Sequence, residues 1–442
     1  NGTTALNIAA SSVGGNLTLT SGNASGITDS GTVTVGGWLR ATTDANNGLI
    51  NLGTLAVDGT VQLTTNGSGN ATVVNDAGLN FAASTVGGVL NATATTGNMT
   101  DSGALSISGT SSFTTAANNA DITLNNTNAL TGAVTLSTTG STGNALIDNG
   151  TTALNLATSS VGGNLTLTSG HYIIDSRAVT VGGNLVATTD AANGSIHMDG
   201  LRVDGTVQLT THGSGDATVV NDAGLTFLAS TVRNLAATAT TGDIVDSGVL
   251  TVTGTSSFTT SQNNADINLN NTNALTGTVA LNTSGSTGNA TVDNGITALN
   301  IAASTVGGNL TLTSGHASGI IDSGTVTVGG NLAATTDANN GLINLGTLAV
   351  DGTVQLATNG SGNATVVNDA GLTFAASTVG GNLAATATTG NMTDNGALAI
   401  TGTTTLTTSA NNATIALDTT TNAFTGAVTI TTNDNSGTDA DV

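Results

Sequence analysis

A tandem repeat is the feature that most limits what this chain can fold into. The segment NGTTALNIAASSVGGNLTLTSG at residue 1 returns as NGTTALNLATSSVGGNLTLTSG at residue 149 and as NGITALNIAASTVGGNLTLTSG at residue 294. The three copies, residues 1–148, 149–293 and 294–442, follow one another without a linker. Neighbouring copies of one unit bury the same faces against each other, so the sequence predicts one continuous stacked structure instead of separate globular domains.

A shorter period lies inside each copy. Pairs of apolar residues separated by one residue recur at short intervals, and in the first copy they are Leu6/Ile8, Val33/Val35, Leu55/Val57, Leu79/Phe81 and Leu105/Ile107, followed by Leu130. Apolar residues at alternate positions indicate strands with one buried face. Intervals of roughly 20 to 30 residues predict one coil of a solenoid per pair. We therefore expect six coils per copy and about eighteen in the chain.

Two further apolar columns complete each predicted coil. One is Leu17/Leu19, Leu39/Ala41, Val61/Leu63, Leu90/Ala92, Ser111/Phe113 and Val134/Leu136, and the other is Ile27, Leu49, Val74, Met99, Leu124 and Leu146. Three short strands per coil would stack into three parallel sheets around a dry core. The predicted fold class is all-β, a right-handed parallel β-helix, because right-handed crossovers are the default for parallel strands.

The composition supports strands and restricts the partners. The chain has no Lys, Glu, Pro or Cys, so strong helix formers are scarce, no disulfide is available and no proline interrupts a ladder. A net charge of −22 opposes binding to nucleic acid or to an anionic lipid surface. No apolar run reaches the roughly 20 residues of a membrane-spanning helix, so we expect no membrane insertion. We also expect that a signal peptide was removed or lies outside this segment.

Three segments carry a resemblance to a known class of proteins. GGNLTLTSG, ITDSGTVTVGG and NNADITLNNTNALTGAVTLSTTG resemble the strand repeats of filamentous-haemagglutinin-like exoproteins of two-partner secretion and of related autotransporter adhesins. The resemblance implies export across the outer membrane of a diderm bacterium, folding outside the cell as a right-handed β-helix, and a place at the cell surface. It implies a structural stalk for an adhesive tip, with other copies, flanking parts of a longer chain, or a host ligand as partners.

Acidic and amide residues form a candidate column, one per predicted coil: Asp29, Asn51, Asp76, Asp101, Asn126 and Asp148. Asp and Asn favour turns because their side chains bond to nearby backbone groups and they tolerate left-handed conformations. The alternative is a row of Ca²⁺ sites at Asp29, Asp76, Asp101 and Asp148, since Asp76 and Asp101 in neighbouring coils would repel unless a cation bridged them.

Trp38 and Arg40 form a candidate contact surface. Both are expected to point outward from one strand, and the other copies have Asn184 and Asn331 in place of Trp38, and Val186 and Ala333 in place of Arg40. Exposed Trp and Arg are enriched where proteins contact partners. An isolated exposed aromatic residue is also common on surfaces without a partner.

No catalytic site or cofactor is expected. Lys is absent, and His171, His197, His212 and His316 are scattered, so no acid–base pair can be proposed. Three functions stay open from the sequence: a non-enzymatic stalk, a self-assembling surface layer, sheath or filament, and a solenoid whose Thr-rich face binds ice or carbohydrate.

Overall fold

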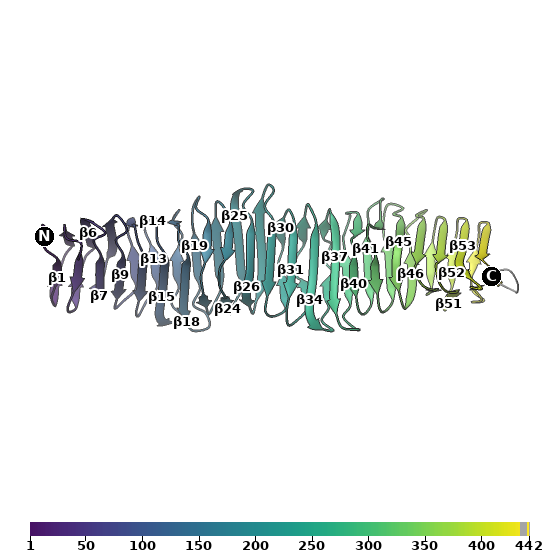
Figure 1. The fold of residues 1–442 in the computed structure, drawn as a ribbon, viewed down its shortest axis with the longest axis horizontal. Helices are drawn as coiled ribbons and strands as arrows, with labels where there is room; N and C mark the ends of the chain where they lie inside the picture. Colours follow the sequence, from purple (N-terminus) through teal and green to yellow (C-terminus); the bar gives the residue numbers. More distant parts are fainter. Residues whose placement is uncertain (434–439, 442) are drawn as a thin grey trace. The chain divides into compact units, whose positions relative to one another are not determined.

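The computed structural model describes residues 1–433, 440 and 441, and these residues form a parallel β-solenoid of about 20 turns (Figure 1). Over the described residues there are 57 strands and no helix. Accordingly, no helix of the described chain is long and apolar enough to cross a membrane. The chain divides into two compact units, Asn1–Asp222 and Ala223–Val442, and each unit has the same kind of coil.

Hydrogen bonds gather the strands of the first unit into two parallel sheets. Sheet A contains β1 (Leu6–Ile8), β2 (Ser11–Val13), β4 (Ile27–Asp29), β5 (Val33–Val35), β7 (Ile50–Val57), β9 (Ala71–Asn75), β12 (Leu90–Ala94), β15 (Ser111–Asn118), β18 (Val134–Thr139), β20 (Leu154–Leu156), β21 (Ser159–Val161), β23 (Ile173–Asp175), β24 (Val179–Val181), β26 (Ile196–Val203) and β28 (Ala217–Asn221). Sheet B contains β3 (Leu17–Ser21), β6 (Leu39–Asn46), β8 (Thr60–Asn66), β10 (Leu79–Phe81), β11 (Ser84–Val86), β13 (Met99–Asp101), β14 (Leu105–Ile107), β16 (Ile122–Leu124), β17 (Ala129–Leu130), β19 (Ala145–Asp148), β22 (Leu165–Ser169), β25 (Leu185–Ala192) and β27 (Thr206–His212).

Most coils have three strands, as the sequence predicts. The first coil is β1, β2 and β3, and the second is β4, β5 and β6. The expectation of three separate sheets is wrong, because the two short strands on one side of the coil are joined by a bend and belong to one sheet. The other side of the coil carries one longer strand. The cross-section therefore has one bent side and one straighter side.

Each coil is shorter than the sequence columns suggested. The residues that pair in succession along sheet A are Leu6, Ile27, Ile50, Ala71, Leu90, Ser111 and Val134. The next strand in this sheet is β20, which begins the second copy. One copy thus contains seven coils, not six, and the expected eighteen coils are corrected to about 20.

One motif lies on both sheets, and for this reason the sequence columns predicted six coils per copy instead of seven. The sequence ALNIAASSVGG at residue 5 has a close relative, GLNFAASTVGG, at residue 78, about half a copy later. The first gives β1 and β2 in sheet A, whereas the second gives β10 and β11 in sheet B. A third version, ALNLATSSVGG at residue 153, gives β20 and β21 in sheet A again. The true repeat is therefore half a copy, about three and a half coils.

The second unit shows the same alternation. There, β29 (Leu225–Phe227) lies in sheet B, β39 (Leu299–Ile301) in sheet A and β48 (Leu372–Phe374) in sheet B. Since each repeat adds half a turn beyond three full turns, equivalent residues of successive repeats within a unit lie on opposite sides of the coil stack. Every second repeat returns to the same side.

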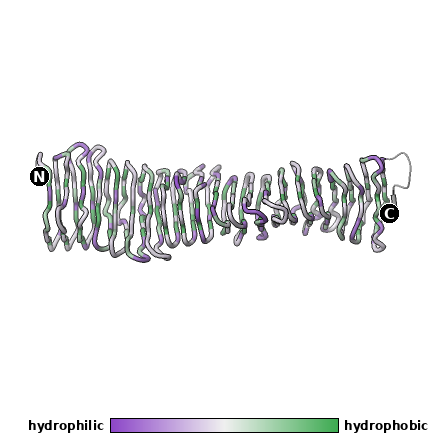
Figure 2. The backbone as a smooth tube through the Cα atoms, turned by 60° about the horizontal axis from the view of Figure 1, so that its bottom comes forward, coloured by the Kyte–Doolittle hydropathy of each residue, from purple (hydrophilic) through white to green (hydrophobic). Residues whose placement is uncertain are grey.

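The core consists of the inward residues of both sheets. Hydrophobic and hydrophilic segments alternate around the coils of each unit (Figure 2), and Ile50, Leu63, Phe81 and Phe113 are at most 1% exposed. Aliphatic and phenylalanine side chains stacked this way exclude water and stabilise the coils.

Two predicted columns are wrong in part. Leu79 pairs with Met99 instead of Leu105, because Leu105 pairs with Ser84. In the other column Leu49, Val74 and Leu146 are partly exposed, and the buried positions are Ile50, Val73 and Ile147. A shift of one residue moves a side chain to the opposite face of a strand. Where adjacent residues are all Val, Leu or Ile, the sequence therefore does not determine which of them faces the core.

A buried asparagine begins each repeat after the first, at Asn75, Asn149, Asn221, Asn294 and Asn368. Asn149 accepts a hydrogen bond from the amide of Leu130 at 2.8 Å and donates to the Leu130 carbonyl at 3.2 Å. Its amide also donates to the carbonyls of Thr152 and Ala153. Asn75 makes the same pair of bonds to Val57. The side chain thus replaces a backbone partner where the chain turns between sheets.

We predict that Asn149→Ala leaves the Leu130 amide and carbonyl buried without partners, which costs about 2 kcal/mol locally. Hydrogen exchange of the Leu130 amide should then be roughly 30-fold faster. Asn91→Ala is the matched control, since Asn91 is exposed on β12. Equal exchange rates at Leu130 in the two variants would contradict this role for Asn149.

Candidate functional site

At the same bend of every repeat, one aspartate binds the backbone of the next coil. In unit 1, Asp29 accepts hydrogen bonds from the amides of Gly53 at 3.0 Å and Thr54 at 2.7 Å. Asp101 accepts from the amides of Asn125 and Asn126 and from the Asn128 side chain, and Asp175 accepts from the amides of Asp199 and Gly200. A carboxylate suits this place because it offers two acceptor oxygens to two successive amides. We call these residues, with Asp246, Asp322 and Asp394 of unit 2, the bend carboxylates.

The predicted acidic column does not exist as one line. Asp29 ends β4 in sheet A, Asp76 follows β9 in sheet A, and Asp101 ends β13 in sheet B. Asp76 and Asp101 are therefore not stacked neighbours, and the residue that pairs with Asp101 is Phe81. Asp148 accepts a bond from the amide of Gly150, two residues on, which is a turn of the kind expected.

The amide members of that column also have separate roles. Asn126 donates its backbone amide to Asp101, and its side chain donates to the Asp101 carbonyl. Asn51 is exposed and pairs in register with Thr28 and Thr72. Among the residues that the structure describes, no group of three or more His, Cys, Asp or Glu side chains is arranged to hold a metal ion.

A ladder of surface asparagines, partly or fully exposed, links successive coils of unit 1. The side-chain oxygen of Asn144 accepts from the amide of Asn164, that of Asn164 from Asn184, and that of Asn184 from Thr206, at 2.8 to 2.9 Å. Asn164 and Asn184 are the Asn of the GGN motif. The GGN motif therefore stabilises the contact between coils. Its glycines leave room for the preceding coil, and its asparagine side chain accepts a hydrogen bond from the next coil.

Trp38 interrupts the equivalent ladder in the first copy. Its amide donates to the side-chain oxygen of Asn16 at 3.0 Å, but an indole has no acceptor to offer Thr60 in the next coil. The Trp38 side chain is 42% exposed, and with Arg40 it lines a recess of about 220 Å³ whose other walls are Leu39, Thr60, Gln62 and Ala82. The two predicted contact residues thus lie together on the outer face of sheet B.

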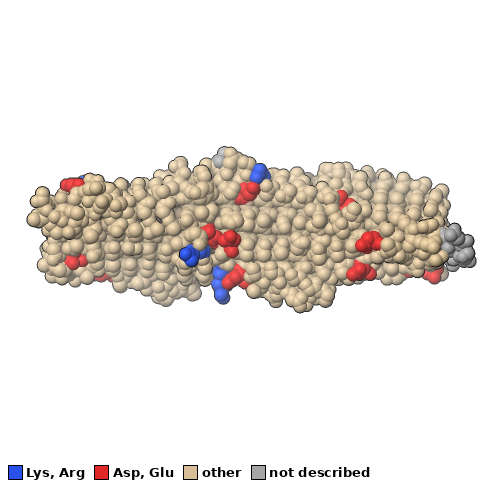
Figure 3. Space-filling view, in the orientation of Figure 1, with Lys and Arg blue, Asp and Glu red and all other residues tan. Residues whose placement is uncertain are grey.

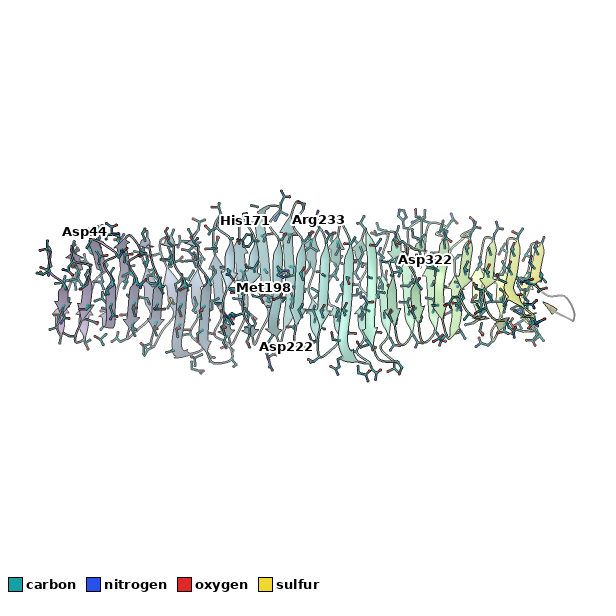
Figure 4. All side chains as sticks on the ribbon, in the orientation of Figure 1. Asp44, His171, Met198, Asp222, Arg233 and Asp322 are labelled. Carbon is teal, nitrogen blue, oxygen red and sulfur yellow. The ribbon has the colours of Figure 1, made fainter. Side chains whose placement is uncertain are left out.

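The second copy holds three of the four His and three of the four Arg residues, so the sequence leaves open a local recognition patch there beside simple drift within the repeat. The acidic partners of these bases, Asp199 and Asp222, were not predicted. His197 lies 3.4 Å from Asp199, and Arg202 lies 3.9 Å from Asp222. Met198 is fully buried between the exposed residues His197 and Asp199, as expected for alternating faces of a strand, and Figure 4 shows Asp222 at the edge of the stack. Copies 1 and 3 carry Asn, Gly and Ala at the positions of His197, Asp199 and Arg202. Comparing the copies at these three positions could have revealed the patch.

Burial raises the pKa of Asp175 above its ordinary value, although the amides of Gly200 and Asp199 oppose this change. The negative charge of Asp199 raises this pKa further. The bend carboxylate of this repeat lies beside a second acid, whereas glycine stands at the equivalent position 53 in the first copy. The other histidines make local contacts: the ring of His171 packs edge-on against Tyr172, and His212 bonds to the Thr189 carbonyl.

A family model described as repeats of unknown function (DUF5649) matches six segments of the chain, which are residues 1–53, 68–137, 142–210, 214–282, 287–346 and 361–431. The chain belongs to this family. No curated protein and no solved structure matches it.

The DUF5649 matches correspond to the structural repeat. From the second match onward, each begins at the same short distance before one of the buried asparagines, and all six matches contain one bend carboxylate each. One DUF5649 repeat is therefore about three and a half coils with one bend carboxylate, and successive repeats within each unit of this chain place it on alternate sheets.

We predict that Trp38→Asn restores the ladder of this DUF5649 repeat. The new side-chain oxygen would accept from the Thr60 amide, as Asn184 and Asn331 do from Thr206 and Thr353. The gain should be about 0.5–1 kcal/mol, seen as slower hydrogen exchange at Thr60. Trp38→Ala, which removes the ring without supplying an acceptor, is the control. Identical protection of Thr60 in the two variants would contradict the ladder.

Proposed function

We propose that the chain is a structural stalk segment of a large secreted bacterial surface protein of the adhesin type, without enzymatic activity. The observation that carries this proposal is that polar side chains at equivalent positions of the repeats form hydrogen bonds that hold the coils together. The bend carboxylates, the buried asparagines and the ladder asparagines all direct their hydrogen bonds to neighbouring coils. A repeat built this way can be extended without changing its core.

The surface location is supported by composition and by the resemblance of the repeats to exported β-helices. A net charge of −22 keeps such a protein dispersed, and the absence of cysteine makes its stability independent of redox conditions. The filamentous-haemagglutinin-like identity, with export by two-partner secretion or as an autotransporter, is part of the same proposal.

A non-enzymatic role is favoured because the acids recur at regular structural positions. Three of the acids singled out by sequence have their oxygens bonded to backbone amides, namely Asp29, Asp101 and Asp148. A Ca²⁺ ion would have to displace these donors, so we propose that stability does not depend on it.

A second function, self-assembly into a surface layer or filament, is favoured by Trp38. This residue replaces a ladder asparagine and exposes a large ring beside Arg40. A contact with another copy would compensate for the ladder bond that is lost.

Negative-stain electron microscopy of the purified chain, with and without a chelator, separates the two functions. A stalk segment should give isolated particles whose appearance and melting temperature do not change with chelation or with added Ca²⁺. Ordered sheets or fibres that disappear in Trp38→Ala would contradict the stalk proposal and support assembly. Fibres that disappear on chelation would instead support the Ca²⁺ sites that the acidic column predicts.

A further inference from the structure

A surface recess recurs in two repeats with the same lining. In the first repeat it has a volume of about 290 Å³, and in the fifth about 310 Å³. Each lies where a long strand of sheet A bends, at β7 in unit 1 and at β45 (Ile343–Val350) in unit 2. The lining residues are Thr32, Gly53, Thr54, Leu55, Val74, Asp76 and Thr95 in one, and Thr325, Gly346, Thr347, Leu348, Val367, Asp369 and Thr388 in the other.

The carboxylate of each recess has no side-chain partner among the described residues. Asp76 and Asp369 are exposed, and neither side chain takes part in a hydrogen bond or an ion pair. This separates them from the nearby bend carboxylates Asp29 and Asp322, whose oxygens are bonded to the strand that bends. The recess carboxylate is therefore an acid that the coil stack does not use.

The third repeat shows which group pairs with a carboxylate at this position. Leu55 pairs with Asn75, Leu201 with Asn221, and Leu348 with Asn368. The residues that follow are therefore equivalent: Ala56 stands by Asp76, Arg202 by Asp222, and Ala349 by Asp369. Arg202 lies 3.9 Å from Asp222, so the chain itself places a guanidinium against this carboxylate where an arginine is available. Basic groups lie beside acidic groups in the view of Figure 3 as well.

We propose that the recesses at Asp76 and Asp369 bind arginine side chains of a basic partner polypeptide. The carboxylate would pair with the guanidinium, and the hydroxyl oxygens of Thr54 and Thr95, or of Thr347 and Thr388, would accept its remaining N–H groups. Val74, the partly exposed apolar residue of the lining in unit 1, suits the methylene stem of arginine. This site goes beyond the proposed stalk function and does not depend on it.

Charge and the number of available oxygen ligands favour an arginine of a basic polypeptide over two other occupants, a second copy of the chain and a Ca²⁺ ion. A second copy of the chain also has a net charge of −22, and it has only four arginines and no lysine to pair with a carboxylate. A Ca²⁺ ion requires about six to eight oxygen ligands, whereas each recess offers one carboxylate and a few hydroxyls. A basic polypeptide is attracted by the whole molecule and finds in each recess a single carboxylate to pair with.

The test is a titration of the full chain with N-acetyl-arginine amide, followed by amide shifts in NMR spectra. N-acetyl-citrulline amide has a similar shape without the charge and is the control ligand. We expect shifts at Asp76 and Thr95, and at Asp369 and Thr388, that saturate with the arginine ligand and are absent with citrulline. Shifts spread evenly over exposed aspartates would overturn the proposal, because they would show attraction to the net charge only.

Two variants test the first recess independently. Asp76→Asn should weaken arginine binding there by roughly two- to fivefold, as expected for an exposed ion pair, and should leave the site at Asp369 unchanged. Ala56→Arg copies the third repeat and should fill the recess from within, with the same local loss. Asp58→Asn removes one exposed charge outside the recess and is the matched control. A loss in Asp58→Asn as large as in Asp76→Asn would overturn the proposal.

Discussion

The structure depends on the hydrogen bond between a backbone amide and a carbonyl about one coil away along the chain. Parallel pairing of this kind runs through both sheets of each unit, and it requires that each residue have a partner directly above and below. Extended residues satisfy this easily. The bends do not, because there the backbone groups point away from the ladder and lose their partners. Most of the distinctive sequence features of the chain lie at those bends.

Polar side chains supply the missing partners at the bends. Asparagine can donate and accept, so Asn149 replaces both halves of a backbone pair, whereas an aspartate such as Asp29 can only accept and takes two amides. A group buried in this way must be fully bonded, since an unpaired one costs about 1–3 kcal/mol. Trp38, Arg40, Asp76 and Asp369 lie in recesses and are not used in this way, so they are the candidates for contacts with other molecules.

Sequence reasoning predicted the fold class because alternation and tandem repetition are properties of the chain itself. It predicted three strands per coil, and it placed Leu17, Leu39 and Val61 correctly in one column. It missed the half-turn offset, because GLNFAASTVGG at residue 78 looks like the next coil of the column that starts at Leu6, although it lies on the other sheet. The site at Asp76 was predicted only as one member of a column. Whether its carboxylate is bonded depends on the register between coils, which the columns left undetermined.

Cysteine pairs introduced into a chain that has none measure this register most directly. The structure pairs Thr85 with Ser106, both exposed, across neighbouring strands of sheet B. Neighbouring strands roughly 4.8 Å apart lie within the range that a disulfide can bridge. The account predicts that the Thr85→Cys, Ser106→Cys protein forms a disulfide on mild oxidation, whereas the Asn80→Cys, Ser106→Cys protein does not. A disulfide in the second protein and none in the first would restore the register in which Leu105 stacks on Leu79, and would contradict both the shorter coil and the alternation of repeats between the two sheets.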